Sequence, residues 1–136
     1  MRAIDRWQSL NGREQWLTCV SALAVGTAAL LMRVVSIQRL LRAASGPVSG
    51  SAISDYEIGD RIVAMDRAAR YVPGATCLAK SLTLAWMLRG CGVPAEIRVG
   101  VQTADGFSAH AWVECEGKAL TSAMDAGGTF TVVVSS

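Results

Sequence analysis

Two residues of this 136-residue chain have the chemistry and local setting of a sulfur nucleophile and its base. Cys77 follows the turn-forming residues 71–76 and opens a leucine-rich segment, which indicates a loop leading into a helix. His110, the only histidine, lies in a segment with the alternation of a strand. Helix amides and the helix dipole favour a thiolate, and an imidazole can take and return its proton. The pair predicts nucleophilic catalysis by a cysteine.

Both residues also have a simpler interpretation. A free cysteine is most often a small buried apolar side chain, and a lone histidine in a strand can be a hydrogen-bonded core residue. Strand periodicity puts His110, Trp112 and Glu114 on one face. Trp112 is therefore a candidate for binding substrate and shielding the site from water, with a place in the core as the alternative.

A catalytic imidazole needs a third group to hold its tautomer. Three carboxylates follow His110: Glu114, Glu116 and Asp125. Glu114 shares the face of His110 but lies farther along the same strand, which gives a poor angle to the ring, and Glu116 falls in a turn. Asp125 follows on a later segment that can approach the ring from the side. We therefore predict Asp125 as the third member, and a solvated loop carboxylate is the alternative.

The N-terminal half of the chain has helix signals. Asn11 and Glu14 predict a helix start, and the helix continues to about residue 41 with a break near residues 34–36. Small flexible residues at 43–52 predict a linker. The Ser54–Glu57 capping box opens a second helix, and Thr76 can cap a third, central helix over residues 77–89.

The pattern then changes to a period of two. Strands are predicted over residues 95–103, 108–115, 118–120 and 129–134, with a hairpin turn at Asp105 and Gly106. Helices followed by an antiparallel meander define an α+β class. We expect one domain over residues 1–136, with a hydrophobic helical segment at 1–45 and a catalytic core at 53–136.

Composition excludes several classes of protein. The hydrophobic share is 51% and the charged share 18%, so disorder is not expected, and a net charge of +2 argues against nucleic-acid binding. Four scattered cysteines without CxxC spacing and one histidine make a poor zinc set, and they suggest free thiols in a reducing compartment. We expect no metal, and structural roles for three of the cysteines: Cys19, Cys91 and Cys115.

Residues 16–32 contain no charged side chain, so a membrane helix must be considered. The segment is shorter than the roughly 20 residues that a spanning helix needs, and it includes polar residues. We expect a cytoplasmic protein whose large apolar residues here pack under the catalytic domain, with a contact to a partner protein along the helix edge. Membrane association through this helix is the alternative.

Specific motifs surround the two candidate catalytic residues. They are Pro73-Gly74-Ala75-Thr76-Cys77-Leu78, Leu88-Arg89-Gly90, Gly92-Val93-Pro94-Ala95, Arg98-Val99-Gly100-Val101, His110-Ala111-Trp112-Val113-Glu114 and Gly117. With these motifs the chain resembles the lasso-peptide maturation proteases of the transglutaminase-like superfamily, over residues 7–134. It is similar to the C-terminal half of the microcin-processing B protein.

The resemblance implies a papain-like fold and a leader peptidase. Cys77 would be the nucleophile, His110 the base and Asp125 the third member. The substrate would be the leader of a ribosomally made precursor. Because helices rather than a leader-recognition domain precede Cys77, we expect a separate leader-recognition protein, and an ATP-dependent asparagine-synthetase-like cyclase as a further partner. No cofactor is expected.

Two alternatives use the same fold. A transglutaminase-like enzyme would use the same residues to transfer the acyl group to an amine instead of water. A non-catalytic scaffold would keep the fold and use the N-terminal helix to bind partners, which the intact Cys77 and His110 pair argues against.

Overall fold

The computed structural model describes residues 3–44, 47–51, 53–102, 108–120 and 131–135. Within these residues, helices precede an antiparallel sheet, which confirms the predicted α+β class. The helices are α1 (Ala3–Gln8), α2 (Gly12–Val34), α3 (Ile37–Ala44), α4 (Asp55–Ala69) and α5 (Cys77–Arg89). The strands are β1 (Ala95–Gln102), β2 (Ser108–Cys115), β3 (Lys118–Ala119) and β4 (Thr131–Ser135). The sequence signals did not predict the short helix α1.

Three of the helices begin at the predicted caps. Asn11 caps α2 in a capping box with Glu14, and Ser54 caps α4 in the same way with Glu57. The Thr76 side chain accepts a hydrogen bond from the Ala79 amide at the start of α5. The predicted break after residue 34 is confirmed, because α3 starts anew at Ile37. Local side-chain chemistry thus fixes where the helix that carries Cys77 begins.

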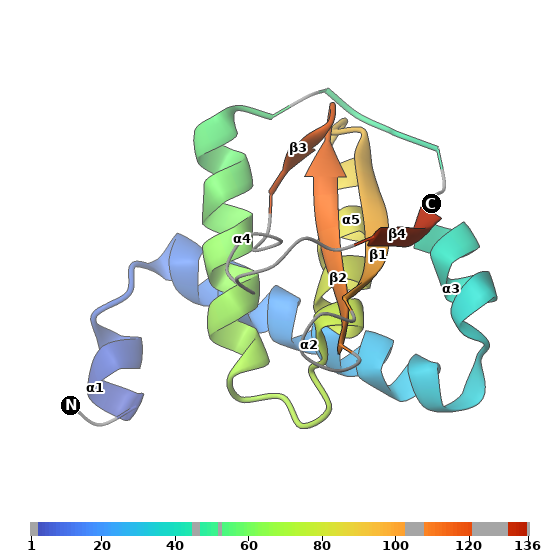
Figure 1. Ribbon diagram of the computed structural model, residues 1–136. Coiled ribbons are helices and arrows are strands. Elements are labelled where there is room, and N and C mark those ends of the chain that lie inside the picture. Colours follow the sequence, from blue (N-terminus) through green and yellow to red (C-terminus); the bar gives the residue numbers. More distant parts are fainter. Residues whose placement is uncertain (1–2, 45–46, 52, 103–107, 121–130, 136) are drawn as a thin grey trace.

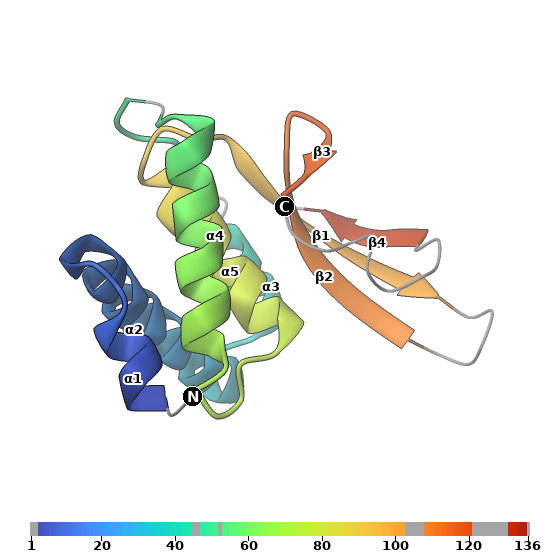
Figure 2. The same ribbon diagram turned by 90° about the vertical axis from the view of Figure 1, so that its left-hand side faces the viewer.

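The molecule has a helical layer and a sheet layer, and α5 lies between them (Figures 1 and 2). α5 contacts α2, α3 and α4 on one side and β1 and β2 on the other, as the central position predicted for it requires. The core joins α5 to the inner face of the sheet and includes Leu84, Leu88, Ile97 and Val113. This double cover holds the N-terminus of α5 in a fixed position relative to β2.

The sheet has the order β3-β2-β1-β4. The predicted meander is correct for β1, β2 and β3 but wrong for the last strand, because β4 pairs with the other edge of β1. The turn residues Asp105 and Gly106 lie outside the described residues. In the pairing of β1 with β2, Arg98 lies opposite Trp112. A two-residue turn at Asp105 and Gly106 would instead place Arg98 opposite Val113. The observed register keeps polar residues opposite polar or amphipathic ones on a common face.

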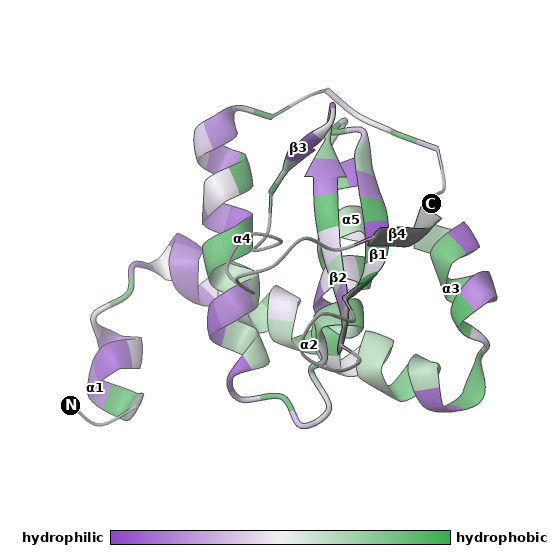
Figure 3. Cartoon of the chain, in the orientation of Figure 1, coloured by the Kyte–Doolittle hydropathy of each residue, from purple (hydrophilic) through white to green (hydrophobic). Residues whose placement is uncertain are grey.

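α2 contradicts the expectation that its large apolar residues pack under the catalytic domain. It packs against α4 and α5, but only Leu17, Thr18, Ser21 and Val25 are buried. Most of the large apolar side chains of this segment are exposed instead, namely Trp16, Leu23, Leu30 and Leu31. The central and C-terminal turns of α2 are coloured mostly as apolar, whereas α4 alternates between polar and apolar residues (Figure 3). Among the described residues, α2 is one helix that is long and apolar enough to cross a membrane.

Candidate active site at the start of α5

Cys77 is the first residue of α5, and the preceding loop is shaped by short-range hydrogen bonds. The Ala75 amide donates to the Val72 carbonyl at 3.3 Å, and the Thr76 amide donates to the Gly74 carbonyl at 2.8 Å. Gly74 has a φ of +79°, a conformation that a side chain would strain, and a Cβ there would lie 3.7 Å from the Cβ of Ala29 in α2. A glycine at this turn lets the loop pass close to α2 before it reaches Cys77.

The cap at Thr76 organises the first turn of α5 around the thiol. Thr76 Oγ1 accepts from the Ala79 amide at 3.2 Å, so it satisfies the amide two residues beyond Cys77. The first amides of a helix have no acceptor within the helix, and those of Cys77 and Leu78 belong to this set. Such amides favour negative charge at the helix start. The half-buried Cys77 thiol lies at this position, beside first-turn amides that can donate to an oxyanion.

His110 lies on β2 opposite Gly100 of β1 and is half-buried. Its neighbours along the strand, Ala111 and Val113, are buried, and Val113 belongs to the core that packs on α5. Since side chains alternate along a strand, His110 lies on the far face of the sheet, together with Trp112 and Glu114. The imidazole therefore points away from the core face.

A connected set of side chains lies beside His110 on the far face. The His110 and Trp112 rings are stacked, with centroids 6.2 Å apart and planes 20° apart. Trp112 is only 5% exposed, and its Nε1 donates to Glu114 Oε1 at 2.9 Å. Arg98 Nε donates to Glu114 Oε2 at 3.1 Å, and Arg98 Nη2 donates to Glu96 Oε2 at 2.8 Å. The ring beside the imidazole is thus fixed by a carboxylate that is itself fixed by an arginine.

The two elements of the predicted pair contact each other, because α5 packs on β2, but His110 lies on the face of β2 opposite to the one that packs on α5. No hydrogen bond between described residues joins Cys77 Sγ to His110, so the pairing of the two side chains stays a prediction. Catalytic hydrogen bonds are often long before substrate binds. The predicted third member, Asp125, lies outside the described residues.

Both alternatives to Asp125 have other surroundings. The two Glu114 oxygens accept from Trp112 and Arg98, so the carboxylate holds the tryptophan and arginine together. Glu116 is an exposed turn residue with a φ of 53°.

The other thiols occupy different environments. Cys19 is exposed on α2, and Cys91 lines a cavity at the opposite end of α5 from Cys77. Cys115, at the end of β2, packs against the core, and burial raises the pKa of its thiol. The carboxylates of Glu116, Asp55 and Glu96 raise it further. Cys115 is therefore kept protonated at neutral pH, which is the opposite of what a nucleophile needs.

Sequence reasoning missed Arg98 as a member of this site. The signal was present, because Arg98 is a polar residue of β1 at the position opposite Trp112 of β2. Reading it requires the register of the hairpin, and a shift by one residue would move Arg98 to the face of Val113. Matching the polar alternation of both strands would have selected the observed register.

We compared the chain with models of known protein families. Residues 22–135 match the family model described as Transglutaminase-like superfamily, and this range includes Cys77, His110 and the Arg98–Glu114–Trp112 set. No curated protein and no solved structure matches the chain.

Proposed function

This chain belongs to the transglutaminase-like superfamily, and from that premise we propose that it is a cysteine peptidase that removes the leader of a lasso-peptide precursor. The observation that carries the proposal is the setting of Cys77. It is the first residue of a central helix that Thr76 caps, and the first-turn amides of this helix point toward the place where negative charge develops. That helix packs on the strand with the only histidine of the chain.

The chemistry follows from the two residues. The Cys77 thiolate attacks the scissile carbonyl, and the Cys77 amide at the helix start donates to the oxyanion that forms. His110, protonated by the thiol, gives that proton to the leaving amine, and the first product departs while a thioester remains. His110 then takes a proton from water, the hydroxide attacks the thioester, and the leader leaves with a new carboxylate as the thiol is restored.

We propose that Trp112 and Asp125 hold the imidazole. The Trp112 ring stacks on His110 and is fixed by Glu114, which limits the rotation of the imidazole on the face that it presents to the reaction. Asp125 would accept from the second ring nitrogen and so fix the tautomer, as in other catalytic triads. Glu114 serves the tryptophan in this assignment, because both of its oxygens already accept hydrogen bonds.

The leader substrate and the partners rest on the motifs around Cys77 and His110. The described residues before Cys77 form helices α1 to α4. We propose that a separate leader-recognition protein raises the local concentration of the precursor at Cys77. An asparagine-synthetase-like cyclase would take the released core peptide.

Acyl transfer to an amine is the second candidate function. The matched family is described as transglutaminase-like, and a transglutaminase transfers an acyl group to an amine. The two functions share the thioester and differ only in the acceptor that attacks it. Hydrolysis places an oxygen atom from water in the new carboxylate of the product, whereas acyl transfer joins an amine to the same carbonyl carbon. The identity of this group therefore distinguishes the two functions.

The test uses a lasso-peptide precursor and a leader-recognition protein, in water enriched in ¹⁸O and with dansylcadaverine as an amine acceptor. A peptidase yields a leader that carries one ¹⁸O in its C-terminal carboxylate, and cleavage speeds up when the recognition protein is added. Dansylated leader without the labelled acid would favour acyl transfer. Equal rates with and without the recognition protein would reject the partner dependence.

A further inference from the structure

We infer that the exposed apolar stripe of α2 binds the surface of an anionic lipid bilayer. The stripe consists of Trp16, Leu23, Leu30 and Val34, whose exposed fractions are 63%, 74%, 64% and 78%. Trp16, Leu23 and Leu30 follow one another at intervals of seven residues, and Val34 is one further turn on, so all four lie on one side of the helix. Leu23, Leu30 and Val34 lie on the side of α2 opposite to its buried residues, which pack on α4 and α5.

α2 does not separate its apolar and polar residues as a water-facing helix does, because two of its four buried residues are polar and its large apolar stripe is exposed. Its buried residues include Thr18 and Ser21, and the Ser21 hydroxyl has no hydrogen-bond partner among the described residues. Arg67 of α4 donates to Thr18 on this inner side. A helix at a water-exposed surface normally buries its apolar side and exposes its polar side. The domain itself therefore leaves this apolar stripe uncovered.

The buried fraction of α2 distinguishes between two reasons for its apolar composition, namely a place in the protein core and contact with a membrane. The core helix of a soluble protein can be as long and apolar as a membrane helix, but it is then mostly buried. Only 22% of the most apolar window of α2 is buried inside the molecule. The inner side remains packed on α4 and α5, so we infer a helix that lies along the bilayer surface rather than one that crosses it.

The charged residues near the stripe indicate which kind of lipid surface it would bind. No aspartate or glutamate occurs between Glu14 and Asp55, whereas three exposed arginines, at positions 33, 39 and 42, lie at the end of α2 and on α3. None of these arginines forms a salt bridge with a described residue. Basic side chains beside an apolar stripe attract anionic head groups while the apolar residues enter the interface. Charge complementarity thus favours an anionic lipid surface.

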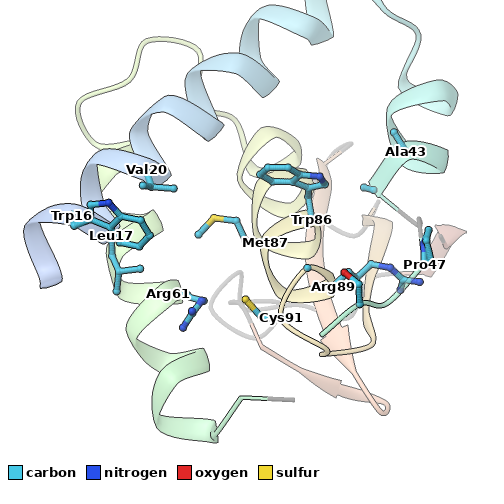
Figure 4. Close-up of a pocket in the computed structure, with 13 residues that line it drawn as sticks. Trp16, Leu17, Val20, Ala43, Pro47, Arg61, Trp86, Met87, Arg89 and Cys91 are labelled. Carbon is cyan, nitrogen blue, oxygen red and sulfur yellow. The ribbon is translucent and has the colours of Figure 1, made fainter. Parts of the chain in front are cut away.

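The apolar surface continues from α2 onto α5. Trp16 and Val20 line one wall of a cavity of about 450 Å³, and Met87 and the exposed Trp86 line the other (Figure 4). Tryptophan is enriched at the interface between water and hydrocarbon. An acyl chain could enter this cavity beside the stripe. The cavity lies at the C-terminal end of α5, whereas Cys77 is at its N-terminal end.

The test is flotation of the purified full chain with vesicles of phosphatidylcholine alone or of phosphatidylcholine with phosphatidylglycerol. The wild type is expected to float with the anionic vesicles, and Leu23→Glu with Leu30→Glu should lower the partition at least tenfold. The control is Tyr56→Glu with Val63→Glu, which adds the same charge at exposed apolar positions of α4 and should leave the partition unchanged. Circular dichroism checks that all variants are folded.

The arginines have a test of their own. Arg33→Gln, Arg39→Gln and Arg42→Gln should each reduce binding to the anionic vesicles by about fivefold and leave binding to neutral vesicles unchanged. Cys77→Ala should bind vesicles as the wild type does, so that this surface and the peptidase activity can fail separately. Failure of the wild type to float would overturn the inference. So would a dimer in solution that the Leu23→Glu and Leu30→Glu pair converts to a monomer, because a second copy of the chain would then cover the stripe.

Discussion

α5 and α2 are both long, apolar helices, and the fold uses them in opposite ways. Seven residues of α5 are buried, and the helix is covered by helices on one side and by the sheet on the other. α2 has four buried residues, two of them polar, because only α4 and α5 cover it substantially. Apolar composition therefore does not determine burial, which depends on how many elements pack around a helix. The covered helix presents Cys77 at a fixed place, and the uncovered one presents a surface.

Cysteines on the two helices give the sharpest version of this comparison. Cys77→Ala should reduce cleavage of the precursor by about 10⁴-fold or more, because the nucleophile is lost. Cys19→Ala on exposed α2 is the matched control and should keep near wild-type activity. Rates come from mass spectrometry of the released leader, with thermal melts to show that both variants fold. Cleavage by pure Cys77→Ala at a near wild-type rate would rule out the peptidase.

The base and its support extend the comparison from α5 to the sheet. His110→Ala should be about as damaging as Cys77→Ala, since the two act as a unit. Asp125→Asn should lower kcat by about 10³–10⁴-fold, because the tautomer is no longer fixed. Glu114→Gln should cost much less, since an amide oxygen can still accept from Trp112 while the charge opposite Arg98 is lost. A silent Asp125→Asn together with a damaging Glu114→Gln would make Glu114 the third member.

Leucines on the two helices test the difference in burial directly. Leu84 of α5 is fully buried, and Leu84→Ala should reduce the free energy of unfolding by about 2–5 kcal/mol, because it leaves a cavity in the core. Leu23→Ala on α2 removes the same atoms from an exposed position and should change stability by less than about 0.5 kcal/mol. Urea unfolding followed by circular dichroism measures both. Equal losses would show that α2 is covered in solution.

Short-range signals made most of the helices predictable. The caps at Asn11, Ser54 and Thr76 act within one turn of the chain, and sequence contains all that they need. The position of β4 beside β1 and the register that places Arg98 opposite Trp112 depend on contacts between distant segments. The exposure of α2 depends on which elements fail to cover it. Cys77 at a helix start was therefore predictable, whereas the set of side chains around His110 was not.

Threonines on the two helices give a smaller effect. Thr76→Ala removes the cap of α5 and should lower the free energy of unfolding by about 1 kcal/mol. It should also lower the rate of cleavage, because the first turn around Cys77 becomes less ordered. The control is Thr27→Ala on α2, whose exposed hydroxyl only donates to the Leu23 carbonyl of the preceding turn. If both variants lose the same stability and activity, the cap has no special role in positioning the thiol.

The smallest expected effect is on the pH dependence of stability. It comes from the thiol of Cys115, at the end of β2. Burial, and then the carboxylates of Glu116, Asp55 and Glu96, raise the pKa of its thiol above the ordinary value. A raised pKa means that, as pH rises, the unfolded chain loses this proton before the folded chain does. Stability from this group is therefore complete at neutral pH and is lost as the pH rises through about 9 and above.

Cys115→Ala should remove this part of the alkaline loss of stability. The measurement is the free energy of unfolding at several pH values from 7 to 10, under reducing conditions. At pH 7 the thiol is protonated in both states, so the difference between variant and wild type there reports packing alone. If the two pH profiles stay parallel up to pH 10, the thiol is not desolvated, and β2 does not pack on α5 at this position as closely as the structure shows.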